Sequence, residues 1–415
     1  MFRTTPNGEA ITRAIRPDRT RITQLDSLRF FAILGVLVTH EWYADPLPWI
    51  FGNLDPGHVG VRLFFVLSGF LITGILLRCR RRTEEFGDRR SVLTRRFYAR
   101  RFLRIYPLYF AVLAVIIFVG IEPTRLLWPW MVTYTTNIYI SVHHQWIGPS
   151  GIFWTLAVEE QFYLIWPLLV LLVPRRWLIP LLVGMIALSP MYRLYASVHV
   201  PGDLLNGNTA GTFTLAVFDS LGMGALIAVL ADRDGARGSL DHRLSHIALP
   251  VGGITVLVLL FIAHYHGVTA NFIFGETALA LVLGWIVATA SRGFTGPVGR
   301  VLEWTPISYL GRISYGIYIF HAFVPILLLW VGKRLGLEFT GEPRLLNFVL
   351  VSSVTVAIAA LSWRLFERPI NDLKRYFPYR DDRRPEPAVA PADLVAGRDP
   401  VNVMLAASSD DHRTS

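Results

Sequence analysis

Three ionisable side chains lie within one apolar segment, Leu25 to Trp42, which reads LDSLRFFAILGVLVTHEW. Asp26 and Arg29 stand near its start, and His40 stands near its far end. Charged side chains at this depth in a bilayer cost about 2.5 to 3.5 kcal/mol each to insert, so a chain that carries them usually needs them. This segment is therefore the first candidate for a functional site.

Arg29 and His40 share one face of the helix that this segment predicts. They are eleven residues apart, and eleven steps of about 100° return to within about 20° of the same direction while rising roughly 16 Å. Asp26 precedes Arg29 by three residues and can hold its guanidinium in an ion pair. Histidine is the usual general base for a hydroxyl group, so His40 is a candidate catalytic base. A structural histidine, hydrogen-bonded inside a bundle, is the alternative.

A second candidate lies in the segment FYARRFLRIYPLYF, where Arg100, Arg101 and Arg104 stand at the entry to an apolar run. Guanidinium forks match phosphate oxygens bidentately, so the sequence predicts a clamp for a phosphate-rich donor at this place. Ordinary anchoring by basic residues at the cytoplasmic membrane face would explain the same arginines without a ligand.

Two adjacent carboxylates, Glu159 and Glu160, lie in the apolar segment FWTLAVEEQFYLIWPLL. On a helix they point about 100° apart, so one can face a polar cavity while the other pairs with an arginine. Neither is cheap in lipid, which makes both candidate site residues. Ser68 and Gly69 lie in GVRLFFVLSGFLIT without a GxSxG motif, and we interpret them as small residues that permit close helix packing.

The last polar residues of the apolar part lie in ISYLGRISYGIYIFH and SWRLFERPI. Tyr315, Tyr318 and His321 follow one another at intervals of three and share a helix face, either for packing or as cavity lining. Glu367 lies at the inner end of the last apolar run, where we expect it to cap the helix or to pair with a neighbouring arginine.

The composition determines the elements that must position these residues. Of the 415 residues, 53% are hydrophobic and only 17% are charged, and the mean hydropathy is +0.44. Soluble domains have a charged share near 25%, so the chain is predicted to be an all-α, polytopic membrane protein. Segments of about 20 apolar residues cross a bilayer. Ten such spans are predicted, near 27–44, 60–78, 105–121, 152–173, 177–198, 210–231, 247–266, 271–290, 312–331 and 346–366.

The arginines predict the orientation of these spans. Eleven lie between Arg78 and Arg104, and the other basic clusters fall on the same side if both termini are cytoplasmic. The net charge of +10 is therefore attributed to the membrane and not to nucleic acid. One outer loop breaks the pattern, with Lys333, Arg334 and Arg344. The aromatic outer segment 122–151 is expected to lie on the membrane, with an eleventh, shallow span as the alternative.

The chain is predicted to have three parts: a basic cytoplasmic arm (1–24), a transmembrane domain (25–370) and a disordered cytoplasmic tail (371–415). The first apolar run has no small-residue cleavage pattern after it, so we interpret it as an uncleaved span. The single cysteine, Cys79, excludes an internal disulfide and a thiolate metal site, and no metal is expected. The near absence of lysine favours a bacterial source with a GC-rich genome.

Six of these segments together resemble the acyltransferase 3 family of integral membrane acyltransferases. The resemblance runs from about Asp26 to Pro369 and rests, in order, on LDSLRFFAILGVLVTH, GVRLFFVLSGFLIT, RRFLRIYP, FWTLAVEEQFYLIWP, ISYLGRISYGIYIFH and FERP. It implies a ten-span bundle in the bacterial plasma membrane. It also implies acyl-CoA as a cytosolic co-substrate, with no bound cofactor. Some relatives carry an additional esterase-like domain, and this chain is expected to be the stand-alone form.

The resemblance also assigns residues. The family's paired arginine and histidine match Arg29 and His40, and its arginines near the third span match Arg101 and Arg104. Many relatives have an acidic residue where this chain has Arg62. The acceptor is implied to be a hydroxyl of a sugar or glycosylated molecule on the outer side: a surface polysaccharide, a lipid-linked glycan or a macrolide-type metabolite.

The resulting hypothesis is a transfer of an acyl group across the membrane. Arg101 and Arg104, with Arg29, hold the phosphates of acyl-CoA while its pantetheine arm reaches towards His40. His40 takes the proton of the acceptor hydroxyl, and Glu159 or Glu160 orients the imidazole. The alternative is a transporter or flippase that uses intramembrane His, Glu and Arg as a proton or substrate path. Transporters often have internal repeats, and none is visible in this sequence.

Overall fold

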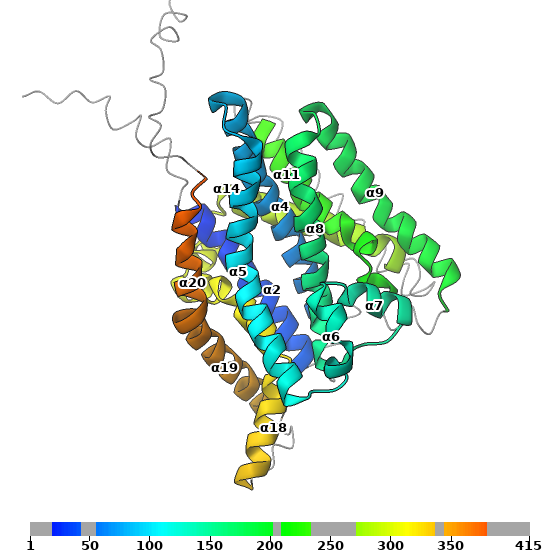
Figure 1. Ribbon diagram of the computed structural model, residues 1–415, viewed down its shortest axis with the longest axis vertical. Coiled ribbons are helices and arrows are strands. Elements are labelled where there is room, and N and C mark those ends of the chain that lie inside the picture. Colours follow the sequence, from blue (N-terminus) through cyan, green and yellow to red (C-terminus); the bar gives the residue numbers. More distant parts are fainter. Residues whose placement is uncertain (1–18, 43–54, 202–208, 234–270, 337–343, 380–415) are drawn as a thin grey trace, which may run out of the picture. The chain divides into compact units, whose positions relative to one another are not determined.

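The computed structural model describes residues 19–42, 55–201, 209–233, 271–336 and 344–379 (Figure 1). All regular secondary structure in these ranges is helical, which confirms the predicted all-α bundle. The α-helices are α2 (Arg19–Glu41), α4 (Pro56–Phe86), α5 (Arg90–Val119), α6 (Thr124–Val132), α7 (Thr136–His143), α8 (Phe153–Leu172), α9 (Arg175–His199), α11 (Phe218–Arg233), α14 (Glu276–Arg292), α15 (Gly296–Leu302), α16 (Thr305–Arg312), α17 (Ser314–Phe320), α18 (Val324–Leu335), α19 (Arg344–Ser362) and α20 (Arg368–Asp372).

The predicted number of spans is not confirmed. Seven helical segments in the described ranges are long and apolar enough to cross a membrane, and the bent pair α17–α18, with an angle of 55° at its break, makes eight if it is one span. The first predicted span corresponds to α2, a helix of 23 residues that is not among these seven. The predicted span near 247–266 lies outside the described residues, as do most of the basic arm and nearly all of the tail.

The aromatic segment 122–151 forms α6 and α7, of nine and eight residues. At 1.5 Å per residue each is about 12 to 14 Å long, less than half of a hydrocarbon core. The segment therefore does not supply an eleventh span. The chain divides into two units, Met1–Phe377 and Pro378–Ser415, and the helices of the described ranges belong to the first.

Helix α4 packs against α2, α8, α11 and α14, and small residues bring its backbone close to two of them. A Cβ atom added to Gly69 would lie 2.0 Å from the carbonyl oxygen of Leu221 in α11. A Cβ on Gly224 would lie 2.0 Å from the oxygen of Val66, so the approach is reciprocal. Only glycine permits such a crossing. The prediction that small residues in this span serve close packing is confirmed for Gly69.

A buried charge network ties α4 to α9, α11 and α14. The Arg193 guanidinium donates to Asp219 at 2.8 Å, and both side chains are fully buried. Arg62 lies 3.4 Å from Asp219 and 2.9 Å from Glu276, which also lies 2.7 Å from His58. Buried charges are tolerated when they are paired in this way. Arg62 is thus neutralised by two carboxylates, Asp219 and Glu276.

Candidate functional site

A cavity of about 100 Å³ lies between α2, α4, α5, α8 and α17. It brings together residues that are far apart in the sequence, and this grouping requires all five helices. Its polar lining consists of Arg29, Ser68, Arg101, Arg104, Thr155, Glu159, Tyr163, Ser314, Tyr315 and Tyr318. The structure therefore places four of the predicted site residues, Arg29, Arg101, Arg104 and Glu159, around one space.

The three arginines of the cavity differ in how they are neutralised. Arg29 forms the predicted ion pair with Asp26, at 2.6 Å. Arg101 lies over the ring of Tyr163, 5.3 Å from its centroid. Within the described ranges, neither Arg101 nor Arg104 has a carboxylate at ion-pair distance. Two guanidinium groups without a partner carboxylate give the cavity an excess of positive charge, which suits an anionic ligand such as a phosphate.

Glu159 is held at the arginine side of the cavity. The Tyr163 hydroxyl donates to Ser68 Oγ at 3.0 Å, and Ser68 Oγ donates to Glu159 Oε1 at 2.5 Å. The Arg101 and Arg29 charges also act on Glu159 electrostatically. Ser68 therefore has a polar contact in the cavity wall, which the packing interpretation of its sequence did not include.

Glu160, the adjacent carboxylate, enters a different environment. It interacts electrostatically with Tyr106, and Tyr106 lies in a group of rings in which Tyr109 and Tyr134 stack at 4.6 Å. The Glu160 Oε1 atom is buried and finds no hydrogen-bond partner among the residues that the structure describes. The two carboxylates thus diverge as helix geometry requires. No hydrogen bond joins either of them to His40 in the described part of the chain.

His40 lies near the other end of α2, beside a second histidine. The ring centroids of His40 and His321 are 5.1 Å apart. His321 is fully buried, and its Nδ1 lies 2.6 Å from the carbonyl oxygen of Tyr318. A carbonyl only accepts, so we assign the proton to Nδ1, which leaves Nε2 as an acceptor. That Nε2 is buried and has no hydrogen-bond partner in the ranges that the structure describes.

Tyr318 connects the two regions. Its ring lines the arginine cavity and lies 5.4 Å from the ring of His321. The Tyr318 hydroxyl accepts from Thr155 and donates to the carbonyl of Ile152, which fixes the ring. A continuous row of side chains therefore leads from the arginines through Tyr318 and His321 to His40, whose own side chain is exposed.

The carboxylate that acts on His40 electrostatically is Asp55. The Thr39 hydroxyl, next to His40 in the chain, donates to Asp55 Oδ1. Asp55 is also the N-cap of α4, because its side chain accepts from the backbone N–H of Gly57 at 3.0 Å. Two constraints therefore hold this carboxylate near the imidazole.

Sequence reasoning missed three residues of this region: Asp55, Ser68 in its polar role, and Glu367. Glu367 accepts a hydrogen bond from Ser362 at 3.1 Å, is 5% exposed and interacts electrostatically with Arg104. It makes no capping hydrogen bond, so that prediction is wrong, and no ion pair with a neighbouring arginine occurs in the described ranges. The five residues 363–367 form a π-helical turn, a feature frequent at functional sites. In the sequence Glu367 is a single acidic residue at the end of a predicted helix, and nothing there indicates a π-helical turn.

One family of known proteins matches most of this chain. The family model described as an acyltransferase domain matches residues 22–364, most of the chain. The chain belongs to the acyltransferase 3 family. The match covers the helices that carry Arg29, His40, Arg101, Arg104 and both glutamates. No solved structure is significantly similar to the chain.

Curated relatives of this acyltransferase are named as O-acetyltransferases. It is similar to the peptidoglycan O-acetyltransferase OatA of Listeria monocytogenes, with 28% identity over 88% of this chain and 58% of the relative. It is also similar to the putative peptidoglycan O-acetyltransferase YrhL of Bacillus subtilis, with 28% identity over 84% and 55%. The chain thus spans between half and two thirds of the length of these relatives.

Among the described residues, no cluster of His, Cys, Asp and Glu could hold a metal ion.

Proposed function

We propose that this protein transfers an acyl group, most simply acetyl, from acyl-CoA to a hydroxyl group of a glycan. The observation that carries this proposal is the pair of guanidinium groups, Arg101 and Arg104, that face a cavity and have no carboxylate at ion-pair distance among the described residues. The phosphates of CoA supply the missing negative charge, in charge-assisted hydrogen bonds. Arg29 is the third arginine of the anion site, and it adds less net positive charge because it is paired with Asp26.

The position of the arginines indicates the side of the membrane from which the donor binds. The arginines lie towards the end of the bundle where α4 ends and α5 begins, and the stretch Arg78–Arg104 around that connection contains eleven of the chain's 38 arginines. By the positive-inside rule this end, and both termini, lie in the cytoplasm of a bacterium, where acyl-CoA is made. The roughly 16 Å rise from Arg29 to His40 is then spanned by the pantetheine arm. The thioester reaches the opposite half of the membrane.

In the transfer step His40 accepts the proton of the acceptor hydroxyl as its oxygen attacks the thioester carbonyl. The new C–O bond forms, the C–S bond breaks, and the sulfur leaves as CoA thiolate, which takes up the proton from His40. The imidazolium that forms is stabilised by Asp55, whose charge acts on His40 from the start of α4. Glu159, which accepts a hydrogen bond from Ser68, belongs to the arginine cavity and not to the surroundings of His40.

His321 positions the reacting groups. Its Nε2 can only accept a hydrogen bond, and no group among the described residues donates one. A donor is therefore needed there when substrates bind, and the two donors at hand are the acceptor hydroxyl and a ring N–H of His40, 5.1 Å away between centroids. Either bond would hold His40 and the hydroxyl in register.

The acceptor is a sugar hydroxyl. Relatives named for peptidoglycan O-acetylation favour a cell-surface glycan over a macrolide-type metabolite as this chain's acceptor. A transporter is not favoured, since the chain belongs to an acyltransferase family.

The test uses the purified full-length chain in lipid nanodiscs with acetyl-CoA and soluble fragments of bacterial glycans. We expect release of free CoA thiol only when an acceptor is present, together with an acetyl mass increase on that acceptor. The His40→Ala variant is expected to lose both signals while still binding acetyl-CoA. Equal thiol release by His40→Ala would overturn the base assignment. Movement of an intact substrate across sealed vesicles without acetylation would support transport instead.

A further inference from the structure

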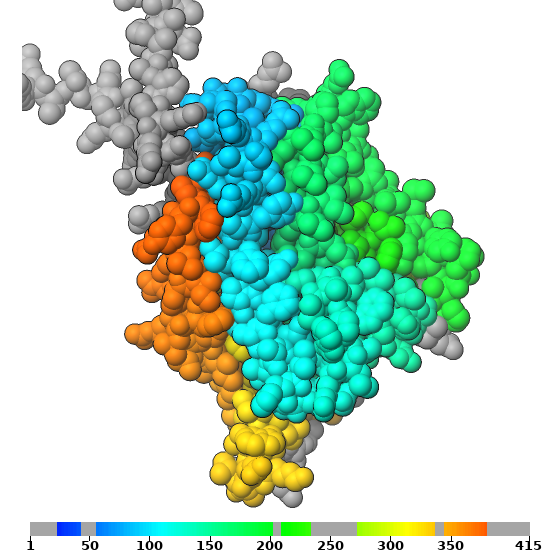
Figure 2. All heavy atoms as spheres, in the orientation of Figure 1, coloured from blue at the N-terminus to red at the C-terminus, as the bar shows by residue number. Residues whose placement is uncertain are grey.

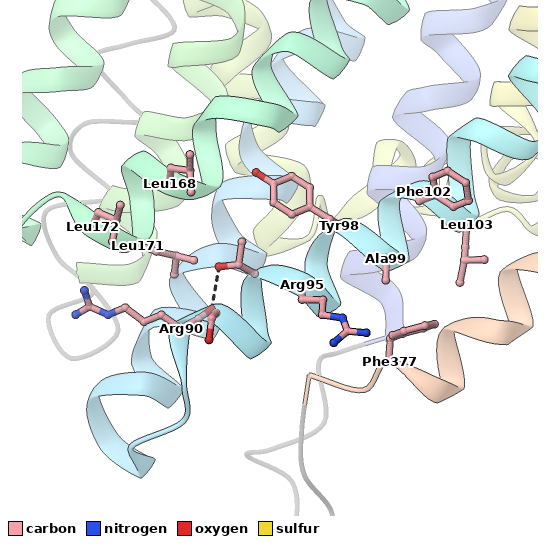
Figure 3. Close-up of a pocket in the computed structure, with 12 residues that line it drawn as sticks. Arg90, Arg95, Tyr98, Ala99, Phe102, Leu103, Leu168, Leu171, Leu172 and Phe377 are labelled. Carbon is pink, nitrogen blue, oxygen red and sulfur yellow. Dashed lines mark hydrogen bonds between the residues drawn. The ribbon is translucent and has the colours of Figure 1, made fainter. Parts of the chain in front are cut away.

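A second cavity, of about 780 Å³, lies between the first half of α5 and the end of α8 (Figure 3). Its lining from α5 includes Tyr98 and Phe102, whereas Arg101 and Arg104 line the site cavity from another face of the same helix. The Tyr98 hydroxyl donates to the carbonyl of Leu164 and joins the two helices at the groove. The groove is therefore separate from the proposed donor site.

The wall of this groove is apolar and uncovered. Leu168 and Leu172 of α8 are 48% and 62% exposed, and Phe102 of α5 is 54% exposed. Figure 2 shows the cyan side chains of α5 beside the green ones of α8 on this face of the molecule. Apolar side chains that are exposed on spanning helices face lipid chains and not water. The wall thus suits a hydrocarbon chain.

The end of the groove is cationic. Arg90 and Arg95 line it at the start of α5, and both side chains are exposed. Neither forms an ion pair within the ranges that the structure describes. Nearby arginines differ: Arg80 pairs with Glu84 at 2.9 Å, and Arg82 pairs with Asp88 at 3.1 Å. The groove therefore has two guanidinium groups that are available to an external anion.

We infer that this groove binds an anionic phospholipid of the leaflet at the α4–α5 end. The lipid phosphate accepts hydrogen bonds from Arg90, Arg95 supplies a second positive charge, and one acyl chain lies along Leu168 and Leu172. Guanidinium groups bind phosphate bidentately, and basic residues at a membrane surface favour anionic lipids. A soluble phosphate compound such as CoA would satisfy the arginines but leave the exposed leucines without a partner. The amphiphile satisfies both parts of the groove.

The test is native mass spectrometry of the full-length protein in detergent, with phosphatidylglycerol or phosphatidylcholine of equal chain length added. The variant Arg90→Gln/Arg95→Gln is compared with Arg176→Gln/Arg300→Gln, which removes two other exposed arginines outside the groove. We expect the first variant to lose phosphatidylglycerol adducts at least fivefold, and the control variant to keep them. Phosphatidylcholine adducts should be equal in all three proteins.

Equal retention of phosphatidylglycerol by wild type and Arg90→Gln/Arg95→Gln would overturn the inference. Two further arms identify the source of the anion. Glycerol phosphate, the head group without chains, should not displace the bound lipid, and acetyl-CoA should not displace it either. Displacement by acetyl-CoA would assign the groove to the donor and refute a lipid site. These outcomes are independent of acyl transfer, because the measurement requires no turnover.

Discussion

The Arg104→Gln substitution tests the donor site most directly. Arg104 lines the cavity and, in the described part of the chain, has no carboxylate partner that would be left unpaired by its removal. The loss therefore falls on the ligand. A hydrogen bond to a charged group is worth about 1.5 to 3 kcal/mol, and each 1.4 kcal/mol is tenfold in affinity. We expect the KM for acetyl-CoA to rise about 10- to 150-fold in the CoA-release assay.

Three comparisons separate this effect from damage to the fold. Arg104→Lys keeps the charge but not the fork, so it should recover only part of the affinity. S-acetyl-pantetheine lacks the diphosphate and ribose phosphate, and its use should change little between wild type and Arg104→Gln. Arg96→Gln removes a charge from α5 outside the cavity and should leave the KM near its wild-type value. An unchanged KM for acetyl-CoA in active Arg104→Gln would refute the phosphate assignment.

Three further predictions concern the base, its partner and the buried charges. His40→Gln is expected to lower kcat by about 10² to 10⁴-fold with an unchanged KM for acetyl-CoA, and a parallel rise in KM would contradict its role as base. Asp55→Asn should lower kcat about tenfold, which corresponds to about 1.4 kcal/mol in the activation barrier. The melting temperature should not change, because asparagine caps helices as well as aspartate does. A wild-type kcat would show that Asp55 does not stabilise the His40 imidazolium. Asp219→Asn leaves the fully buried Arg193 partly uncompensated and should destabilise the bundle by about 3 to 5 kcal/mol. Thermal unfolding in detergent compares it with Glu84→Gln, whose carboxylate is 37% exposed where it meets Arg80 and whose loss should cost about 1 kcal/mol or less. Equal melting temperatures would count against a stabilising network.

The local features of the site could be predicted from the sequence. Helical periodicity fixes the direction of each side chain on its own helix, so the shared face of Arg29 and His40 and the divergence of Glu159 and Glu160 follow from spacing alone. The Arg29–Asp26 ion pair is local for the same reason. Hydropathy was sufficient to predict a helical membrane bundle, and the motifs in their order were sufficient to predict the family.

Only the tertiary structure decided which helix faces meet. The hydrogen bonds from Ser68 to Glu159 and from Thr39 to Asp55 depend on how α4 packs against α8 and α2, which helical periodicity does not show. That placement depends on backbone contacts at glycines such as Gly69, where one missing Cβ sets the crossing of two helices. Periodicity describes a single helix, whereas a site between helices depends on how several of them pack. The sequence alone therefore determined the candidate groups, and the packing decided which of them lie together.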